Sequence, residues 1–182
     1  MTQLITTKRL MLAVMLGTIA IVMQSAFPGI PLGVGGAKLE LADIPVVLGA
    51  TVTGPVGGVI CGILYGISSP AYLALIPSMV LILGVIGYLS DKRNGWFSII
   101  GIIVVMRIVV GPLISGALFN LIYFTTNSFQ NVWLLCLGYA APGAVLCIAI
   151  YPVVVKRIPA LLSANKEKNR EPSSAPPPPA SI

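Results

Sequence analysis

The sequence predicts an all-α membrane protein, a compact bundle of six transmembrane helices followed by a disordered cytoplasmic tail. Of the 182 residues, 57% are hydrophobic and only 9% are charged, whereas a soluble domain carries about 25% charged residues. The mean hydropathy is +0.98, which is also high for a soluble chain. The apolar residues gather in six runs, and a helix needs about 20 such residues to cross a bilayer.

The first three runs surround a loop and a tight turn. The first run covers residues 10–27, and segment 28–36 then crowds two prolines and four glycines into nine positions, which predicts an ordered loop. The second run begins near residue 41 and stops at Gly54-Pro55 after about 13 residues, and the third covers 56–69. Since both are short, we expect helices that are tilted or sheltered by neighbours, and one broken hairpin is an alternative interpretation.

The last three runs cover residues 72–90, 96–124 and 132–155, with polar segments 91–95 and 125–131 between them. Beyond them, a charged stretch precedes four consecutive prolines, a composition that cannot form a packed core. The chain is therefore predicted to comprise a six-helix transmembrane domain, residues 1–162, and a disordered tail, residues 163–182.

The basic residues predict the orientation. In a six-span bundle both termini share one side, which then holds nine of the eleven Lys and Arg residues, while Lys38 lies on the other side and Arg107 within the membrane. Because basic residues gather on the cytoplasmic side, both termini are expected there. A cleaved signal peptide is the alternative for the first 27 residues, but the apolar run is long and Gln24-Ser25-Ala26 is a poor cleavage site.

The sequence lacks the residues that several classes of function require. The chain has no histidine, and its cysteines, Cys61, Cys136 and Cys147, lie singly inside apolar runs, so neither a metal site nor a disulfide framework is expected. No nucleophile stands beside a base, so no catalytic residues are expected, and no cofactor is expected either. The net charge is +6, but the basic residues do not cluster with interleaved aromatic residues, which argues against nucleic-acid binding.

Small residues recur at intervals of four in two of the runs. Gly54, Gly58, Gly62 and Gly66 would share one face of the third helix, where glycine allows close approach of a neighbouring helix. We expect this neighbour to belong to the same chain, and a dimer interface is the alternative. Ala13 and Gly17 form a similar pair on the first helix, for which packing within the chain is the default interpretation.

Arg107 is the most informative single residue. It lies about eleven residues into the fifth run, or about 16 Å deep at 1.5 Å per residue. A charge at that depth must face the bundle interior and be paired, either with an anionic group of a substrate or with a protein carboxylate, of which Asp43 is the nearest candidate. Lys38, Glu40 and Asp43 cluster where the first loop meets the second helix, either in contact with a ligand or as a helix cap with solvated neighbours.

Further polar residues follow Arg107 in the fifth run. Pro112 should kink this helix, and Asn120 and Tyr123 bring polar groups toward its outer end, where they are candidates for an outward-facing pocket. The glycines of segment 33–36 do not form a phosphate-binding loop, because no strand precedes them and no Gly-Lys-Ser/Thr follows. A hinge-rich loop that caps a substrate suits them better.

Residues 38–62 carry a resemblance to a known family. Their Asp43-Ile-Pro opening, short helix, Gly54-Pro55 turn and glycine-rich third helix resemble the second and third helices of the substrate-binding S components of energy-coupling factor (ECF) transporters. The predicted six spans, the long first outer loop and the chain length extend the resemblance over residues 8–157.

This resemblance implies a function, a set of partners and a location. The chain would capture a small water-soluble vitamin or precursor from outside the plasma membrane of a prokaryote. The first loop, residues 28–40, would close over a pocket drawing on Asn120, Tyr123 and Arg107. A transmembrane coupling (T) subunit would dock on Ala13-x-x-x-Gly17, where glycine replaces the family's usual second alanine, and two cytoplasmic ATPase subunits would supply the energy.

A scaffold protein of the rod-shape-determining MreD type is the alternative from another class, and a stand-alone carrier is a third. The alternatives differ in one observable feature. A capture subunit should enclose an outer cavity near Arg107 and Asn120, whereas a scaffold should be packed solid there.

Overall fold

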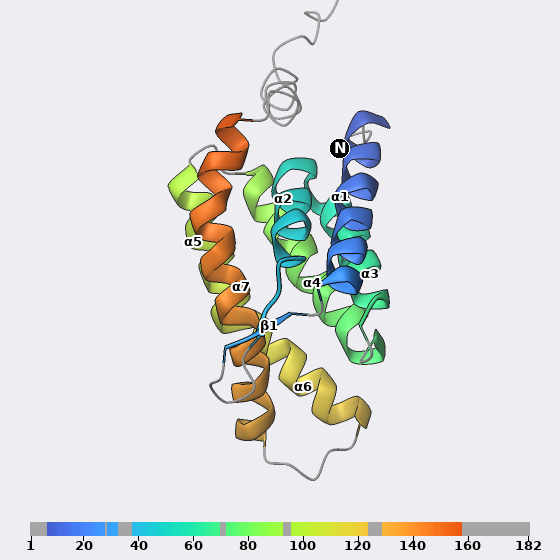
Figure 1. Ribbon diagram of the computed structural model, residues 1–182, viewed down its shortest axis with the longest axis vertical. Helices are drawn as coiled ribbons and strands as arrows, with labels where there is room; N and C mark the ends of the chain where they lie inside the picture. Colours follow the sequence, from blue (N-terminus) through green and yellow to red (C-terminus); the bar gives the residue numbers. More distant parts are fainter. Residues whose placement is uncertain are drawn as a thin grey trace, which may run out of the picture.

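The computed structural model describes residues 7–27, 29–32, 38–69, 72–92, 96–123 and 129–157. Over these residues the chain is almost entirely helical, with one short β-hairpin (Figure 1). In chain order the elements are α1 (Thr7–Ala26), β1 (Ile30–Pro31), β2 (Lys38–Leu39), α2 (Asp43–Thr53), α3 (Pro55–Ile67), α4 (Tyr72–Asp91), α5 (Trp96–Val104), the π-helix η1 (Val105–Val110), α6 (Gly111–Tyr123) and α7 (Phe129–Arg157).

Four helical stretches of the described chain are long and apolar enough to cross a membrane: Thr7–Ala26, Leu73–Asp91, Phe97–Tyr123 and Phe129–Val154. The third of these joins α5, η1 and α6 without a break. Helices α2 and α3 have 11 and 13 residues, or about 17 Å and 20 Å at 1.5 Å per residue, which is less than a hydrocarbon core of about 30 Å. The helical class of the prediction is confirmed, with four rather than six helices of spanning length.

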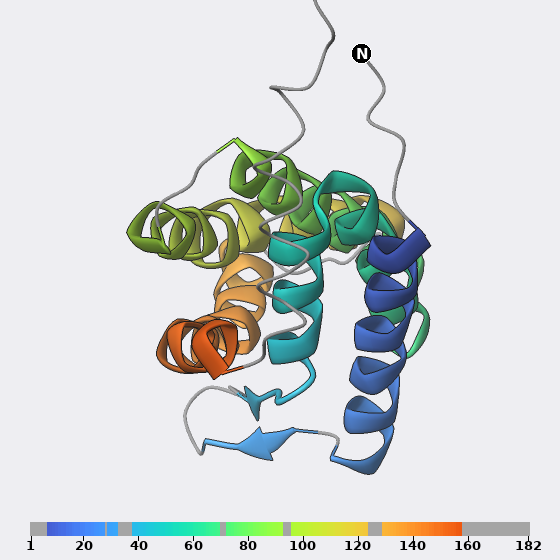
Figure 2. The same ribbon diagram turned by 90° about the horizontal axis from the view of Figure 1, so that it is seen from above.

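The described chain starts and finishes at the same end of the molecule. In Figure 1 the start of α1 and the end of α7 lie at the same end of the molecule, while the β-hairpin and α6 lie in the other half. The hairpin joins α1 to α2, and its strands are antiparallel with Ile30 opposite Leu39. In the view from above, the hairpin lies along one edge of the molecule (Figure 2). It leads from the end of α1 toward α7, and β2 contacts α7.

Helix α2 is the centre of the bundle. Every residue of this helix except Ile44 is buried, and α1, α3, α4 and α7 all pack against it. Gly54 ends α2 with a positive φ of 84°, a conformation that favours glycine, and turns the chain into the antiparallel α3. The expectation that neighbours shelter this short helix is therefore met by its burial.

Glycines bring α3 against α4. A Cβ atom on Gly62 would lie 2.8 Å from the carbonyl carbon of Met79, and one on Gly66 would lie 2.8 Å from the Cα of Ile76. Gly58 likewise leaves no room for a side chain beside the carbonyl of Leu83. The glycine face of α3 therefore packs against α4 of the same chain rather than against a second copy. Gly54 differs from the other three, because it forms the turn before α3.

Ala13 and Gly17 also pack within the chain. Ala13 is fully buried, and its carbonyl oxygen accepts a hydrogen bond from Cys61 Sγ over 3.4 Å. A side chain on Gly17 would meet Leu64 of α3. Helix α3 therefore occupies the face of α1 on which this pair lies.

The close approach of α3 and α4 leads to a test with a matched control. Gly62→Ala should destabilise the protein by about 1–3 kcal/mol, because the new methyl group meets the backbone of α4 and the helices must move apart. Gly101→Ala adds the same methyl group where nothing lies within 4 Å and should be neutral or stabilising. Thermal unfolding of both variants in detergent measures the difference, and equal stabilities would contradict this account of the packing.

Candidate functional site

A cavity of about 510 Å³ lies in the half of the molecule away from the start of α1 and the end of α7. Its walls come from the C-terminal ends of α1 and α3, the N-terminal ends of α2 and α4, the first half of α7, and the helix formed by η1 and α6. Most wall residues are apolar or aromatic. Four are charged: Lys38, Glu40, Asp43 and Arg107.

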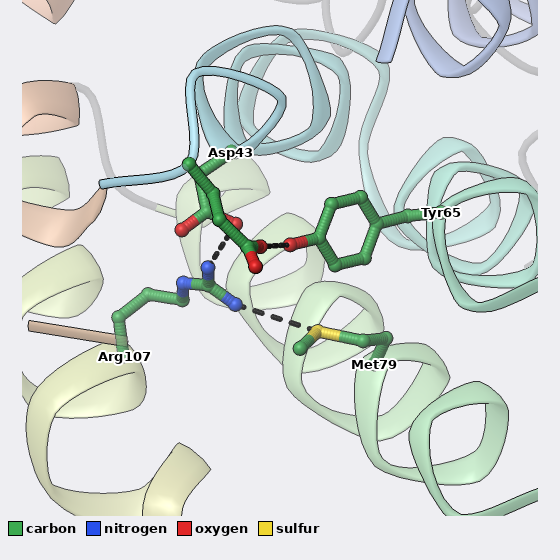
Figure 3. A network of polar contacts seen from close by, with 5 residues as sticks. Asp43, Tyr65, Met79 and Arg107 are labelled. Carbon is green, nitrogen blue, oxygen red and sulfur yellow. Dashed lines mark hydrogen bonds and ion pairs between the residues drawn. The ribbon is translucent and has the colours of Figure 1, made fainter. Parts of the chain in front are cut away.

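Arg107 and Asp43 form a buried ion pair in this wall (Figure 3). The Arg107 side chain projects from η1, and its Nη2 contacts Oδ1 of Asp43, the first residue of α2. The two residues are only 3% and 2% exposed. The start of a helix is a favourable place for a carboxylate, because the helix dipole is positive there. Of the two partners considered for Arg107, the structure therefore shows the protein carboxylate.

The ion pair belongs to a larger polar group, which we call the Arg107 cluster: Glu40, Asp43, Tyr65, Met79 and Arg107. Arg107 Nη1 donates to the sulfur of Met79 over 3.4 Å, and the Tyr65 hydroxyl donates to Oε2 of Glu40 (Figure 3). Burial, and then the charge of Asp43, raise the pKa of the Glu40 carboxyl group. All five residues lie in the cavity wall, so the cavity has one strongly polar side.

A glycine of α7 makes room for Asp43. A Cβ atom on Gly143 would collide with Oδ2 of Asp43, so α7 can approach the start of α2 only because this position has no side chain. The contact holds the Asp43 carboxylate between α7 and η1. Any larger residue at 143 would therefore shift the ion pair.

The remaining walls are built from aromatic and small polar side chains. Lys38 Nζ lies 6.0 Å from the centre of the Tyr139 ring, at the limit of a cation–π contact. The Ser68 hydroxyl donates to Oε1 of Gln24 and links the ends of α3 and α1. Phe119 closes the α6 side of the cavity.

Two residues expected in the pocket lie outside its wall. Asn120 and Tyr123 do not line the cavity, whereas Ser115 and Phe119 do. Ser115 and Phe119 are four residues apart and share a helix face, and Asn120 is about 100° further round. Tyr123 is 39% exposed and packs against Phe119, with 4.7 Å between ring centres and the rings tilted by 38°. Neither residue lines this cavity, and a contact of either one with a substrate stays a prediction.

Other expectations are met only in part by the described residues. Lys38, Glu40, Asp43 and Arg107 do share one cavity. Of the expected capping loop, residues 29–32 and 38–40 are described, whereas 28, 33–37 and the tail 163–182 lie outside the described ranges. Tyr65 was missed by the sequence reasoning, although a tyrosine inside an apolar run is itself a signal, because its buried hydroxyl requires a partner.

No protein-family model, curated protein or solved structure matches this chain. The fold and the cavity nevertheless define a class: a helical protein with several helices of membrane-spanning length and a chamber of ligand size whose polar side is a buried ion pair.

The buried pair should show strong energetic coupling. Asp43→Leu leaves the Arg107 charge buried and unpaired, and Arg107→Met does the same to Asp43, so each should cost about 3–5 kcal/mol of stability. The double variant Asp43→Leu/Arg107→Met removes both charges and should recover most of that loss. Unfolding of the four proteins in detergent measures the coupling. Losses that simply add in the double variant would contradict the pairing.

Proposed function

We propose that this chain is the membrane-embedded substrate-capture subunit of an ATP-driven importer of the ECF type, and that it binds a small water-soluble vitamin or precursor. The observation that carries the proposal is the cavity of about 510 Å³ beside the Arg107 cluster. Sites for small molecules typically measure about 300–1,000 Å³ and combine apolar walls with a few polar groups that orient the ligand. The cavity has both properties.

The position of the cavity fits capture from outside. The two ends of the described chain lie together, and the cavity lies in the opposite half (Figure 1). In this proposal the antiparallel pair α2 and α3 completes a six-span bundle, and both termini are cytoplasmic in the plasma membrane of a prokaryote because nine of the eleven basic residues then face inward. The cavity would consequently open outward.

The cavity also favours capture over the alternative of an MreD-type scaffold. A scaffold gains stability by filling its interior, and every empty volume costs packing energy. The described chain instead keeps a chamber of about 510 Å³ with charged residues in its wall. A binding role explains why this volume and these charges are retained.

Transport in this proposal draws its energy from partners. Within the described helices the buried carboxylate is Asp43, which is paired with Arg107, so no relay of acidic residues runs across the bundle as a proton-driven pump would need. A transmembrane coupling subunit and two cytoplasmic ATPase subunits would supply the power stroke. The coupling subunit would contact residues other than Ala13 and Gly17, because α3 covers that pair.

The proposal is tested by identifying the cargo. We expect the full-length protein, purified in mild detergent and then denatured, to release about one small polar molecule per chain, identifiable by mass spectrometry. Gly101→Ala, which alters an exposed position, should retain the molecule, while Asp43→Leu/Arg107→Met should lose it. If the protein is empty, and stays empty after incubation with a panel of vitamins, the scaffold alternative is favoured.

A further inference from the structure

Arg107 has more hydrogen-bond donors than the described protein uses. Its guanidinium group carries five N–H donors. Nη2 contacts Asp43, and Nη1 has only the thioether sulfur of Met79, a weak acceptor, at 3.4 Å. Nε is buried and has no hydrogen-bond partner among the described residues. Because an unmet buried donor is costly, an oxygen acceptor brought to this group would be stabilised strongly.

Glu40 provides an acceptor in the same cavity wall. Its Oε2 accepts a hydrogen bond from the Tyr65 hydroxyl, and an ionised carboxylate has two oxygens that together can accept several hydrogen bonds. Glu40, Asp43 and Arg107 all line this cavity. Donor capacity on Arg107 and acceptor capacity on Glu40 therefore lie in the same polar wall of the chamber.

The charges in the wall already balance. Two cations, Lys38 and Arg107, face two carboxylates, Glu40 and Asp43. An anionic ligand would lose its hydration and meet both carboxylates, while a cationic ligand would lose its hydration and meet both Lys38 and Arg107. An uncharged ligand avoids both costs.

The other walls suit a flat ring. Phe119 of α6 and Tyr139 of α7 contribute aromatic side chains, and Leu75 and Leu135 contribute apolar surface. Aromatic side chains favour stacked or edge contacts with planar rings. A ligand that is planar and polar at one edge would match both sides of the cavity.

We infer that the cavity selects an uncharged nitrogen heterocycle whose edge carries a ring carbonyl beside a ring N–H, as in a lactam or a cyclic ureide. The carbonyl oxygen accepts from Arg107 in place of the Met79 sulfur, and the ring N–H donates to Glu40. This inference rests on the proposed capture function and narrows its substrate class.

The test compares uncharged and charged probes by equilibrium dialysis against the purified full-length protein. Lumichrome, uracil and biotin methyl ester offer the uncharged edge, and nicotinate, thiamine and tryptophan represent an anion, a cation and a zwitterion. At least one uncharged probe should bind about ten-fold or more tightly than every charged one. If a charged probe binds as tightly, or if a charged compound co-purifies while no uncharged probe binds, the inference is overturned and the capture function stands. If nothing binds and nothing co-purifies, the capture function itself fails.

Substitutions at Arg107 and Glu40 test whether these residues bind the polar edge of the ligand. Arg107→Lys keeps a charge beside Asp43 but removes Nε and the planar fork, and should weaken the best uncharged probe about ten-fold. Glu40→Gln replaces the carboxylate that would accept the ring N–H, and it should weaken binding of the same probe. This variant provides a second test if Arg107→Lys is unstable. Val109→Ala, on the exposed face of the same π-helical turn, is the matched control and should bind like the original protein. Unchanged affinity in both site variants would overturn the inference.

Discussion

The charge of Arg107 is the constraint on which the arrangement of the bundle depends. A guanidinium group 3% exposed within a long apolar helix requires a partner, and Asp43 supplies it from the first turn of α2. The pair fixes the start of α2 against the middle of the 96–123 helix, and the missing side chain of Gly143 lets α7 close over the carboxylate. A short helix with its own buried charge thereby becomes the centre of the fold, surrounded by α1, α3, α4 and α7.

The same pair accounts for a cavity in one half of the molecule. Toward the start of α1 and the end of α7, Gly58 lies directly against the carbonyl of Leu83, and Leu83 and Ile86 belong to the apolar core. Away from the ends, charged groups must be paired and hydrogen-bonded, so apolar side chains cannot close the space around them. The resulting chamber has one polar wall and several apolar ones, which is the property that connects the fold to ligand binding.

Much of the helix content follows from the sequence, because apolar runs and their Gly and Pro stops are local signals. The run at 72–90 corresponds to Tyr72–Asp91, and the run at 56–69 to Pro55–Ile67. The π-helical turn Val105–Val110 has no such local signal, and it changes which residues of α6 face the cavity, so Phe119 lines the wall while Asn120 does not. The pairing of Arg107 with Asp43 was predictable because a charge deep in an apolar helix requires a partner of opposite charge. The packing of Ala13 against α3 was not predictable, because it depends on tertiary contacts.

The account is tested most directly at Cys136, which lines the cavity, whereas Cys61 and Cys147 are buried within the bundle at 0% and 2% exposure. The measurement is the labelling rate of Cys136 in intact cells by a membrane-impermeant thiol reagent, with and without the compound that co-purifies with the protein. An outward-opening binding cavity predicts that Cys136 is labelled from outside and that the compound slows this labelling, while the two buried cysteines stay unmodified. Labelling of Cys136 that the compound does not affect, or labelling only after the cells are opened, would contradict the account.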